Sequence, residues 1–163
     1  MAPPGEHHTP GGALMAPMSN AEVAGVLNEL LETCYDGLDG FRTAITEIDN
    51  DDVIAFCQSR IQRIDEAAAD LYTAIQHLGA HPAEHGHPTA RMHRGWIQLR
   101  AALTSGNAAI LAEIERGEVI AAKHYRSALA KPLPEAIHDM VEEQAQGADE
   151  NLERIRSLRE TVR

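Results

Sequence analysis

Four long segments of the chain carry apolar side chains at alternating spacings of three and four residues, which places them on one face of an α-helix. These segments cover residues 23–48, 57–78, 110–128 and 137–162. Aromatic residues make up only 4% of the sequence and no run alternates with a period of two, so strands are not expected. Because each apolar stripe must be buried against the others, the pattern predicts an all-α fold with four long helices.

The residues that flank these stripes have the composition of helix caps and helix breakers. Ser19 and Asn20, followed by Glu22, are typical of a helix start. The sequence DNDD at residues 49–52 combines a turn with a new cap, and the prolines of KPLP at residues 131–134 end one helix and begin the next. Both connections are short enough for antiparallel hairpins.

Residues 80–106 form a much longer connection between the second and third long helices. They begin with a stretch rich in Pro, Gly and His and continue with a short apolar stripe from Met92 to Leu103. A helix of about 15 residues would cover roughly 22 Å, most of the length of a bundle. We therefore expect a ferritin-like four-helix bundle, with this short helix in a crossover that makes the second and third long helices run parallel. A plain up-and-down bundle with a decorated loop is the alternative.

The chain of 163 residues is long enough for one domain with a full hydrophobic core. Residues 1–18 combine Pro, Gly and His without periodicity, which is typical of a flexible segment. We expect a disordered N-terminal tail over residues 1–18 and a ferritin-like bundle domain over residues 19–163.

Charge and hydropathy limit the partners of this protein. The 25 acidic and 14 basic residues give a formal net charge of −11, so the surface should repel phosphate backbones and anionic lipids. We expect neither nucleic acid nor a membrane as a partner. No signal peptide or long apolar run is present, which predicts a cytoplasmic protein. Cys34 and Cys57 lie on apolar stripes and are expected to be buried free thiols.

A ferritin-like bundle raises the question of a di-iron centre. Such a centre needs one inward Glu from each of two helices and a Glu-x-x-His motif from each of the other two. At 100° per residue, the carboxylates of the first two predicted helices point roughly 90° or more away from the apolar stripes. On the third helix, Glu118 lies within roughly 40° of the stripe centre, whereas Glu115 lies about 100° away. We therefore expect no metal and no other cofactor.

Glu118 instead predicts a structural polar layer inside the bundle. The fourth helix presents Gln144 and Asn151 on its stripe, and Gln144 should meet Glu118 across the bundle. A buried carboxylate needs a donor, which Gln144 can supply, and Arg60 at the edge of the second stripe is a possible ion-pair partner. In this interpretation, replacing Glu118 by Leu should leave folding normal. The alternative is an iron site that uses Glu115, Glu118 and His93.

Several motifs together resemble a bacterial ferritin-like family of unknown function, whose members are conserved hypothetical four-helix-bundle proteins. The motifs are DGLDGF at 36–41, HRGW at 93–96, AALTSGN at 101–107, ERGE at 115–118 and QAQGADENLERIRSLR at 144–159. The resemblance covers about residues 20–160 and implies a ferritin-like bundle without an established activity.

The sequence departs from this family in one place. The last helix of the family usually carries Asn-His-Asp, where this chain has Asn151, Leu152 and Glu153. If that histidine is a ligand in the family, Leu152 cannot replace it. The departure is a further argument against a metal site in this chain.

These observations favour a non-enzymatic bundle that self-associates and has a stress-related or scaffolding role in a bacterial cytoplasm. One alternative is a divergent di-metal oxidase or iron-storage protein. Another is an adapter that binds a helix of a partner protein, for which an exposed apolar stripe on the short helix would be the sign.

Overall fold

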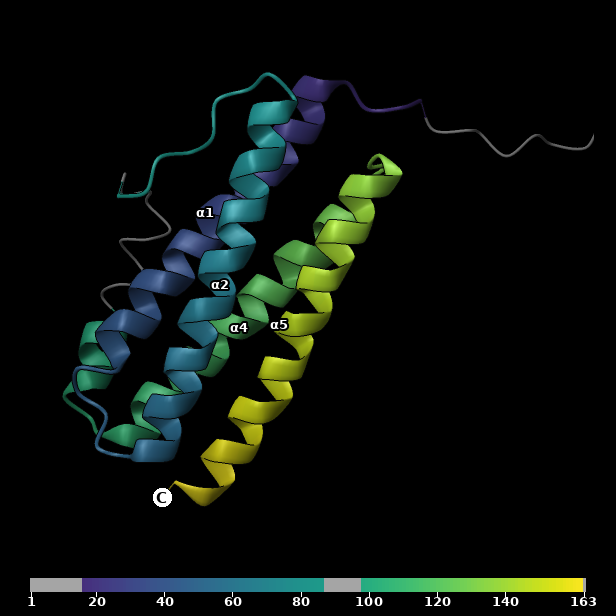
Figure 1. Ribbon diagram of the computed structural model, residues 1–163. Coiled ribbons are helices and arrows are strands. Elements are labelled where there is room, and N and C mark those ends of the chain that lie inside the picture. Colours follow the sequence, from purple (N-terminus) through teal and green to yellow (C-terminus); the bar gives the residue numbers. More distant parts are fainter. Residues whose placement is uncertain (1–15, 87–97, 163) are drawn as a thin grey trace, which may run out of the picture.

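The computed structural model describes residues 16–86 and 98–162, and over these ranges it is helical without any strand. The long helices are α1 (Asn20–Ala44), α2 (Asp51–His77), α4 (Asn107–Leu129) and α5 (Glu135–Thr161) (Figure 1). Residues 98–103, at the end of the long connection, are also helical. The prediction of an all-α fold with four long helices is confirmed. Most of the predicted N-terminal tail and the start of the predicted short helix lie outside the described residues.

The predicted caps are present at the first two helices. Ser19 and Glu22 form a capping box, in which the Ser19 hydroxyl accepts from the Glu22 amide and the Glu22 carboxylate accepts from the Ser19 amide. The Asn50 side chain accepts from the amide of Val53 at the start of α2. These bonds satisfy amides that have no partner within the helix.

The first helix is shorter than its apolar stripe. α1 ends at Ala44 and residues 45–47 form a turn, although Ile48 is only 6% exposed. The apolar pattern therefore continues past the end of the helical hydrogen bonds, because the turn also covers the core. At the other end of the hairpin, α2 ends before Gly79, whose φ of +77° is accessible to glycine at little cost.

The four helices are arranged so that α1 packs against α2 and α4, and α5 packs against α4 and α2. α1 and α5 are therefore diagonal to each other, as are α2 and α4. α2 and α4 begin at the same end of the molecule, where the Asp49 amide donates to Asn107 Oδ1 over 3.3 Å. The two helices therefore run parallel (Figure 1).

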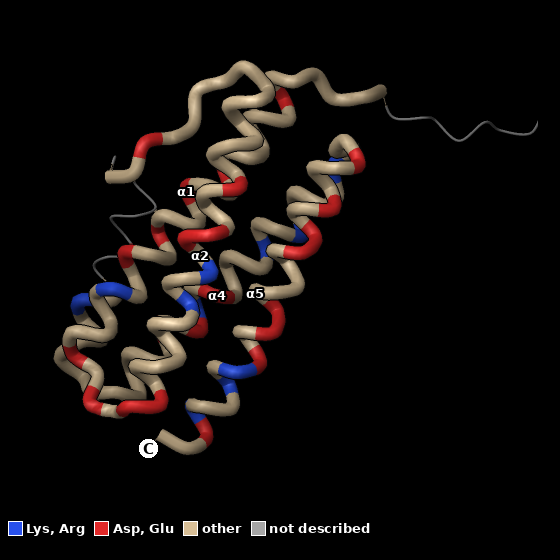
Figure 2. The backbone as a smooth tube through the Cα atoms, in the orientation of Figure 1, with Lys and Arg blue, Asp and Glu red and all other residues tan. Residues whose placement is uncertain are grey.

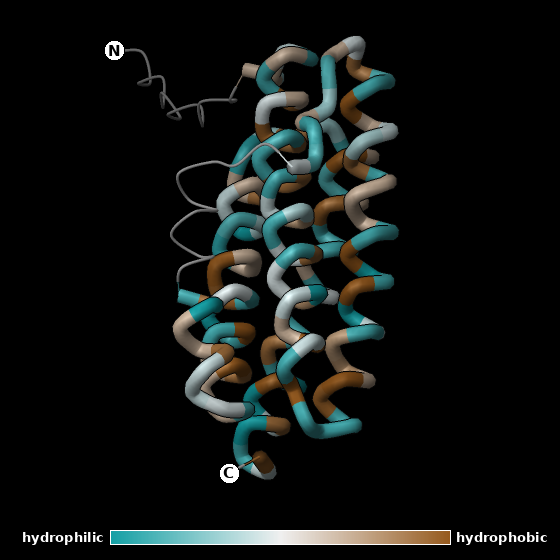
Figure 3. Tube along the Cα trace, turned by 90° about the vertical axis from the view of Figure 1, so that its left-hand side faces the viewer, coloured by the Kyte–Doolittle hydropathy of each residue, from teal (hydrophilic) through white to brown (hydrophobic). Residues whose placement is uncertain are grey.

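Apolar and polar residues alternate along each helix, as Figure 3 shows. The buried apolar side chains form one core to which all four long helices contribute. Acidic residues are distributed along all four long helices (Figure 2). Within the described ranges, no helix combines the length and the apolar character that crossing a membrane requires.

Candidate functional site

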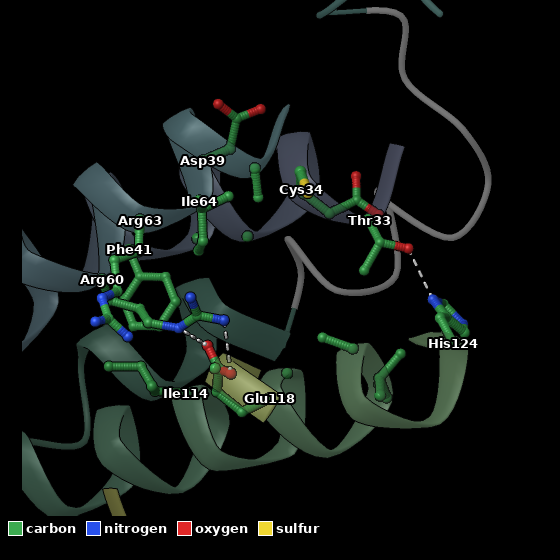
Figure 4. Close-up of a pocket in the computed structure, with 18 of the residues that line it drawn as sticks. Thr33, Cys34, Asp39, Phe41, Arg60, Arg63, Ile64, Ile114, Glu118 and His124 are labelled. Carbon is green, nitrogen blue, oxygen red and sulfur yellow. Dashed lines mark hydrogen bonds and ion pairs between the residues drawn. The ribbon is translucent and has the colours of Figure 1, made fainter. Parts of the chain in front are cut away.

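An ion pair between diagonal helices lies in the middle of the bundle. Arg60 of α2 donates from Nε to Glu118 Oε1 over 2.9 Å and from Nη2 to Glu118 Oε2 over 3.1 Å (Figure 4). Only 10% of the Arg60 side chain and 3% of the Glu118 side chain are exposed. Glu118 is the one buried carboxylate among the described residues. The guanidinium fork matches both carboxylate oxygens, so the charge of Glu118 is neutralised inside the bundle.

Gln144 lines the same cavity as Glu118, but its hydrogen bonds go to other partners than the sequence predicts. Its Oε1 accepts from the Tyr125 hydroxyl over 3.1 Å, and its Nε2 donates to the Ala67 carbonyl over 3.4 Å. The donor to Glu118 is Arg60, because an amide supplies fewer donors than a guanidinium and carries no balancing charge. The expected contact between Gln144 and Glu118 is therefore replaced by two separate polar contacts.

Asn151 is buried, but its amide group bonds within its own helix. The side chain donates to the Gly147 carbonyl, one turn earlier in α5. Such a bond satisfies a buried amide locally, without a partner on another helix. Of the four residues of the predicted polar layer, the structure thus brings Arg60 and Glu118 together and places Gln144 and Asn151 in other contacts.

A thiol and a phenol lie next to this ion pair. The Cys34 sulfur and the Tyr125 hydroxyl oxygen are 3.6 Å apart. Burial raises the pKa of Cys34 to about 11 and that of Cys57 to about 12, and it also raises the pKa of Tyr125 well above its ordinary value. Both cysteines are free and buried, as predicted. Because both thiols are protonated at neutral pH, neither is prepared to act as a nucleophile.

Glu115, the second glutamate of the alternative iron site, faces α5. Arg156 donates from Nε to Glu115 Oε1 over 2.9 Å, and Arg159 donates to the other oxygen. These two hydrogen bonds lower the pKa of Glu115. Glu115 and Glu118 are therefore held by arginines of different helices. His93, the third residue of that proposed site, lies outside the described residues.

One further group of possible metal ligands lies on the surface. His138, Asp139 and Glu142, near the start of α5, bring one ligand atom each to within 4.8 Å of one another. His138 is half-buried and the two carboxylates are exposed. Neighbouring acidic side chains are common on helix surfaces, and this group has no connection to the bundle interior.

A cavity of about 1160 Å³ adjoins the central ion pair and is lined by all four long helices. Arg60, Glu118, Cys34 and Tyr125 contribute to its wall, and Figure 4 shows the side chains around it. Sequence reasoning did not find this cavity, because the volume between helices depends on how they pack. The only available signal was the presence of glycines within segments that otherwise have strong helical patterns.

Comparison with protein families gives one match. The family described as a domain of unknown function, DUF2383, matches residues 22–131. The chain belongs to the DUF2383 family. The match includes both members of the Arg60–Glu118 pair and ends before α5 begins, so the partners of Glu115 lie beyond it. No curated protein matches the chain.

Proposed function

We propose that this DUF2383 protein is a non-catalytic, ferritin-like bundle with a structural or scaffolding role, linked to stress, in the cytoplasm of a bacterium. The ferritin-like assignment is supported by the parallel course of α2 and α4 and by the long connection between them. A self-associating bundle is suited to such a role, since its outer faces are available to other copies.

The observation that carries this proposal is that Glu115 and Glu118 on α4 are both already hydrogen-bonded to arginines. Both oxygens of Glu118 accept hydrogen bonds from Arg60, and both oxygens of Glu115 accept from Arg156 and Arg159. A metal ion that recruited these carboxylates would have to displace the guanidinium groups. It would also leave the positive charge of Arg60 buried without a partner, which is costly.

The alternatives are less well supported. An iron-binding oxidase or storage protein would need several free inward carboxylates, and the one buried carboxylate of the described ranges is already paired. An adapter for a partner helix would present apolar side chains on the short helix. In the described part of that helix, Leu99 and Ala102 are each only 7% exposed.

Metal analysis tests the non-catalytic proposal directly. The protein, free of tags, would be reconstituted with ferrous iron under anaerobic conditions, washed with a chelator and examined by mass spectrometry for metal content. We expect no retained iron. The variant Arg60→Met, which releases Glu118 from its partner, is the matched comparison. Two irons per chain in the unmodified protein would overturn the proposal in favour of a di-metal centre.

Self-association is tested by light scattering coupled to size-exclusion chromatography over a range of concentrations. A scaffolding protein of this kind is expected to form a defined oligomer. A monomer at every concentration would contradict the self-association part of the proposal.

A further inference from the structure

The cavity beside the Arg60–Glu118 pair is partly open to solvent and is large for a helical bundle. Helix interfaces are normally packed as densely as organic crystals, with few voids larger than a water molecule. Here a volume of about 1160 Å³ remains open, lined by the four long helices and by Gln98 and Leu99. This is somewhat more than the roughly 300–1,000 Å³ of pockets that hold small organic molecules, which often lie between the helices of bundles.

Glycines in the middle of helices line this cavity. Among the described residues, five glycines lie within the long helices, and Gly37, Gly40, Gly117 and Gly147 line the cavity whereas Gly25 does not. Glycine destabilises a helix interior relative to alanine, so its repeated use there needs a reason.

Close packing does not explain two of these glycines. Apart from the neighbouring residues and the backbone of the same helix, no described atom lies within 4 Å of the position that a Cβ would occupy at Gly40 or at Gly117, and the same holds at Gly25. A side chain at Gly40 or Gly117 would therefore meet open space instead of a neighbouring helix. Gly40 is half-buried and Gly117 is exposed, and the lack of a side chain at each position leaves that part of the cavity wall open.

The charged groups around the cavity are unbalanced. Seven carboxylates and four guanidinium groups line it among the described residues. Each of these four arginines has a carboxylate partner within 4.0 Å. By contrast, Asp70 of α2 and Glu143 of α5, which are exposed at the rim of the cavity, form no ion pair with any residue that the structure describes.

The remaining lining is largely apolar. Phe41, Ile64, Ile114 and Met140 contribute to it from all four helices. An apolar wall favours a hydrophobic ligand body, and unbalanced carboxylates favour a positive charge on that ligand. The net charge of −11 adds a long-range attraction for cations and repels anions.

We propose that the cavity between the four helices binds an amphipathic organic cation, with its apolar body against the cavity wall and its charged group towards Asp70 and Glu143. This inference goes beyond the proposed structural role and does not depend on it. A bundle that fails the metal or oligomer tests above could still bind such a ligand.

The test uses three fluorescent probes of different charge on the full-length protein. Rhodamine 6G is a cation, Nile red is neutral and 8-anilinonaphthalene-1-sulfonate is an anion. We expect saturable binding of rhodamine 6G, measured by fluorescence anisotropy, with an affinity at least about tenfold higher than for the anionic probe. Added salt should weaken this binding, because it screens the carboxylates.

Variants distinguish binding of the probe in the cavity from binding elsewhere on the protein surface. Gly40→Leu and Gly117→Leu each place a side chain in the cavity and should reduce the affinity for rhodamine 6G by about tenfold or more. Gly25→Leu is the matched control, because it changes a helical glycine that does not line the cavity, and it should leave the affinity unchanged. The double variant Asp70→Asn, Glu143→Gln should remove the preference for the cation.

Circular dichroism and thermal melting would verify that each variant is folded before binding is compared. Absence of saturable rhodamine binding would overturn the proposal. Equal effects of Gly25→Leu and Gly40→Leu would also overturn it, since binding would then not depend on the cavity. Tighter binding of the anionic or the neutral probe would refute the assignment of a cationic ligand.

Discussion

Replacing Glu118 by Leu is expected to destabilise the protein strongly, which reverses what its sequence alone predicts. The sequence suggests a polar group that could be replaced without loss. In the structure, however, the partner of Glu118 is the guanidinium of Arg60, of whose side chain only 10% is exposed. Removing the carboxylate therefore leaves a buried positive charge without compensation, and this charge has no other ion-pair partner among the described residues.

The size of the effect follows from burial of the pair. Removal of one partner from a buried ion pair costs about 3–5 kcal/mol. For a chain of this length, each kcal/mol lowers the melting temperature by about 2–4 °C, so Glu118→Leu should lower it by roughly 6–20 °C. The free energy of unfolding would be measured by guanidinium chloride titration followed by circular dichroism. The slope of the titration indicates whether the surface exposed on unfolding has changed.

The double variant Arg60→Met, Glu118→Leu distinguishes the effect on stability of losing the ion pair from the effect of leaving one buried charge without a partner. We expect it to be at least as stable as the unmodified protein, because apolar replacement of both partners removes the desolvation cost of each. Glu113→Gln is the control on the same helix. It breaks the pair with Arg116, whose side chain is 41% exposed, and should cost less than about 1 kcal/mol.

Two results would refute this reasoning. If Glu118→Leu is as stable as the unmodified protein, Arg60 must be solvated or paired in another way. If the double variant is less stable than Glu118→Leu, the pair contributes more through its specific geometry than its desolvation costs.

Three further predictions concern the thiols, the α4–α5 contact and a helix cap. A thiol reagent such as DTNB should react with neither Cys34 nor Cys57 in the native protein and with both after denaturation. The reason is that burial raises the pKa of Cys34 to about 11 and that of Cys57 to about 12. Rapid labelling of the native state would contradict this prediction. The pKa of Glu115 is lowered in the folded state, so its contribution to stability is present above its unfolded pKa and lost as the pH falls through the folded value. Glu115→Gln should therefore reduce stability at pH 7 and have little effect in acid, in denaturant titrations at both pH values; an equal loss at both would argue against a role for the charge. Ser19→Ala removes the hydroxyl of the capping box and should cost about 1 kcal/mol in the same assay, whereas an unchanged midpoint would mean that the start of α1 does not limit stability.

The helices could be predicted because their signals are local. The spacing of apolar residues along one segment determines which face is buried, and this required no knowledge of the other segments. The caps at Ser19 and Asn50 could likewise be predicted from a few consecutive residues. The predicted end of the first helix was less accurate. Ile48 continues the apolar pattern because it is buried, but it lies beyond Ala44, the last residue of α1.

The site was predicted only in part. The angular argument correctly placed Glu118 inside the bundle, where it is 3% exposed. The sequence favoured Gln144 as its donor and named Arg60 as a possible ion-pair partner; the structure shows Arg60 in that place, and Gln144 bonds to Tyr125 and Ala67. An inward direction can be read from one helix, but the choice of partner depends on the relative rotation and axial register of two helices.

The sequence by itself determined that this chain forms long amphipathic helices, where most of them begin and end, and which side chains point inward. These properties depend on residues a few positions apart. The tertiary structure alone decided which of the two candidate partners, Arg60 or Gln144, pairs with Glu118, and that an open cavity remains beside the pair. The physical reason is that buried polar groups take the partner that packing brings within hydrogen-bond distance, and packing is a property of all four helices together.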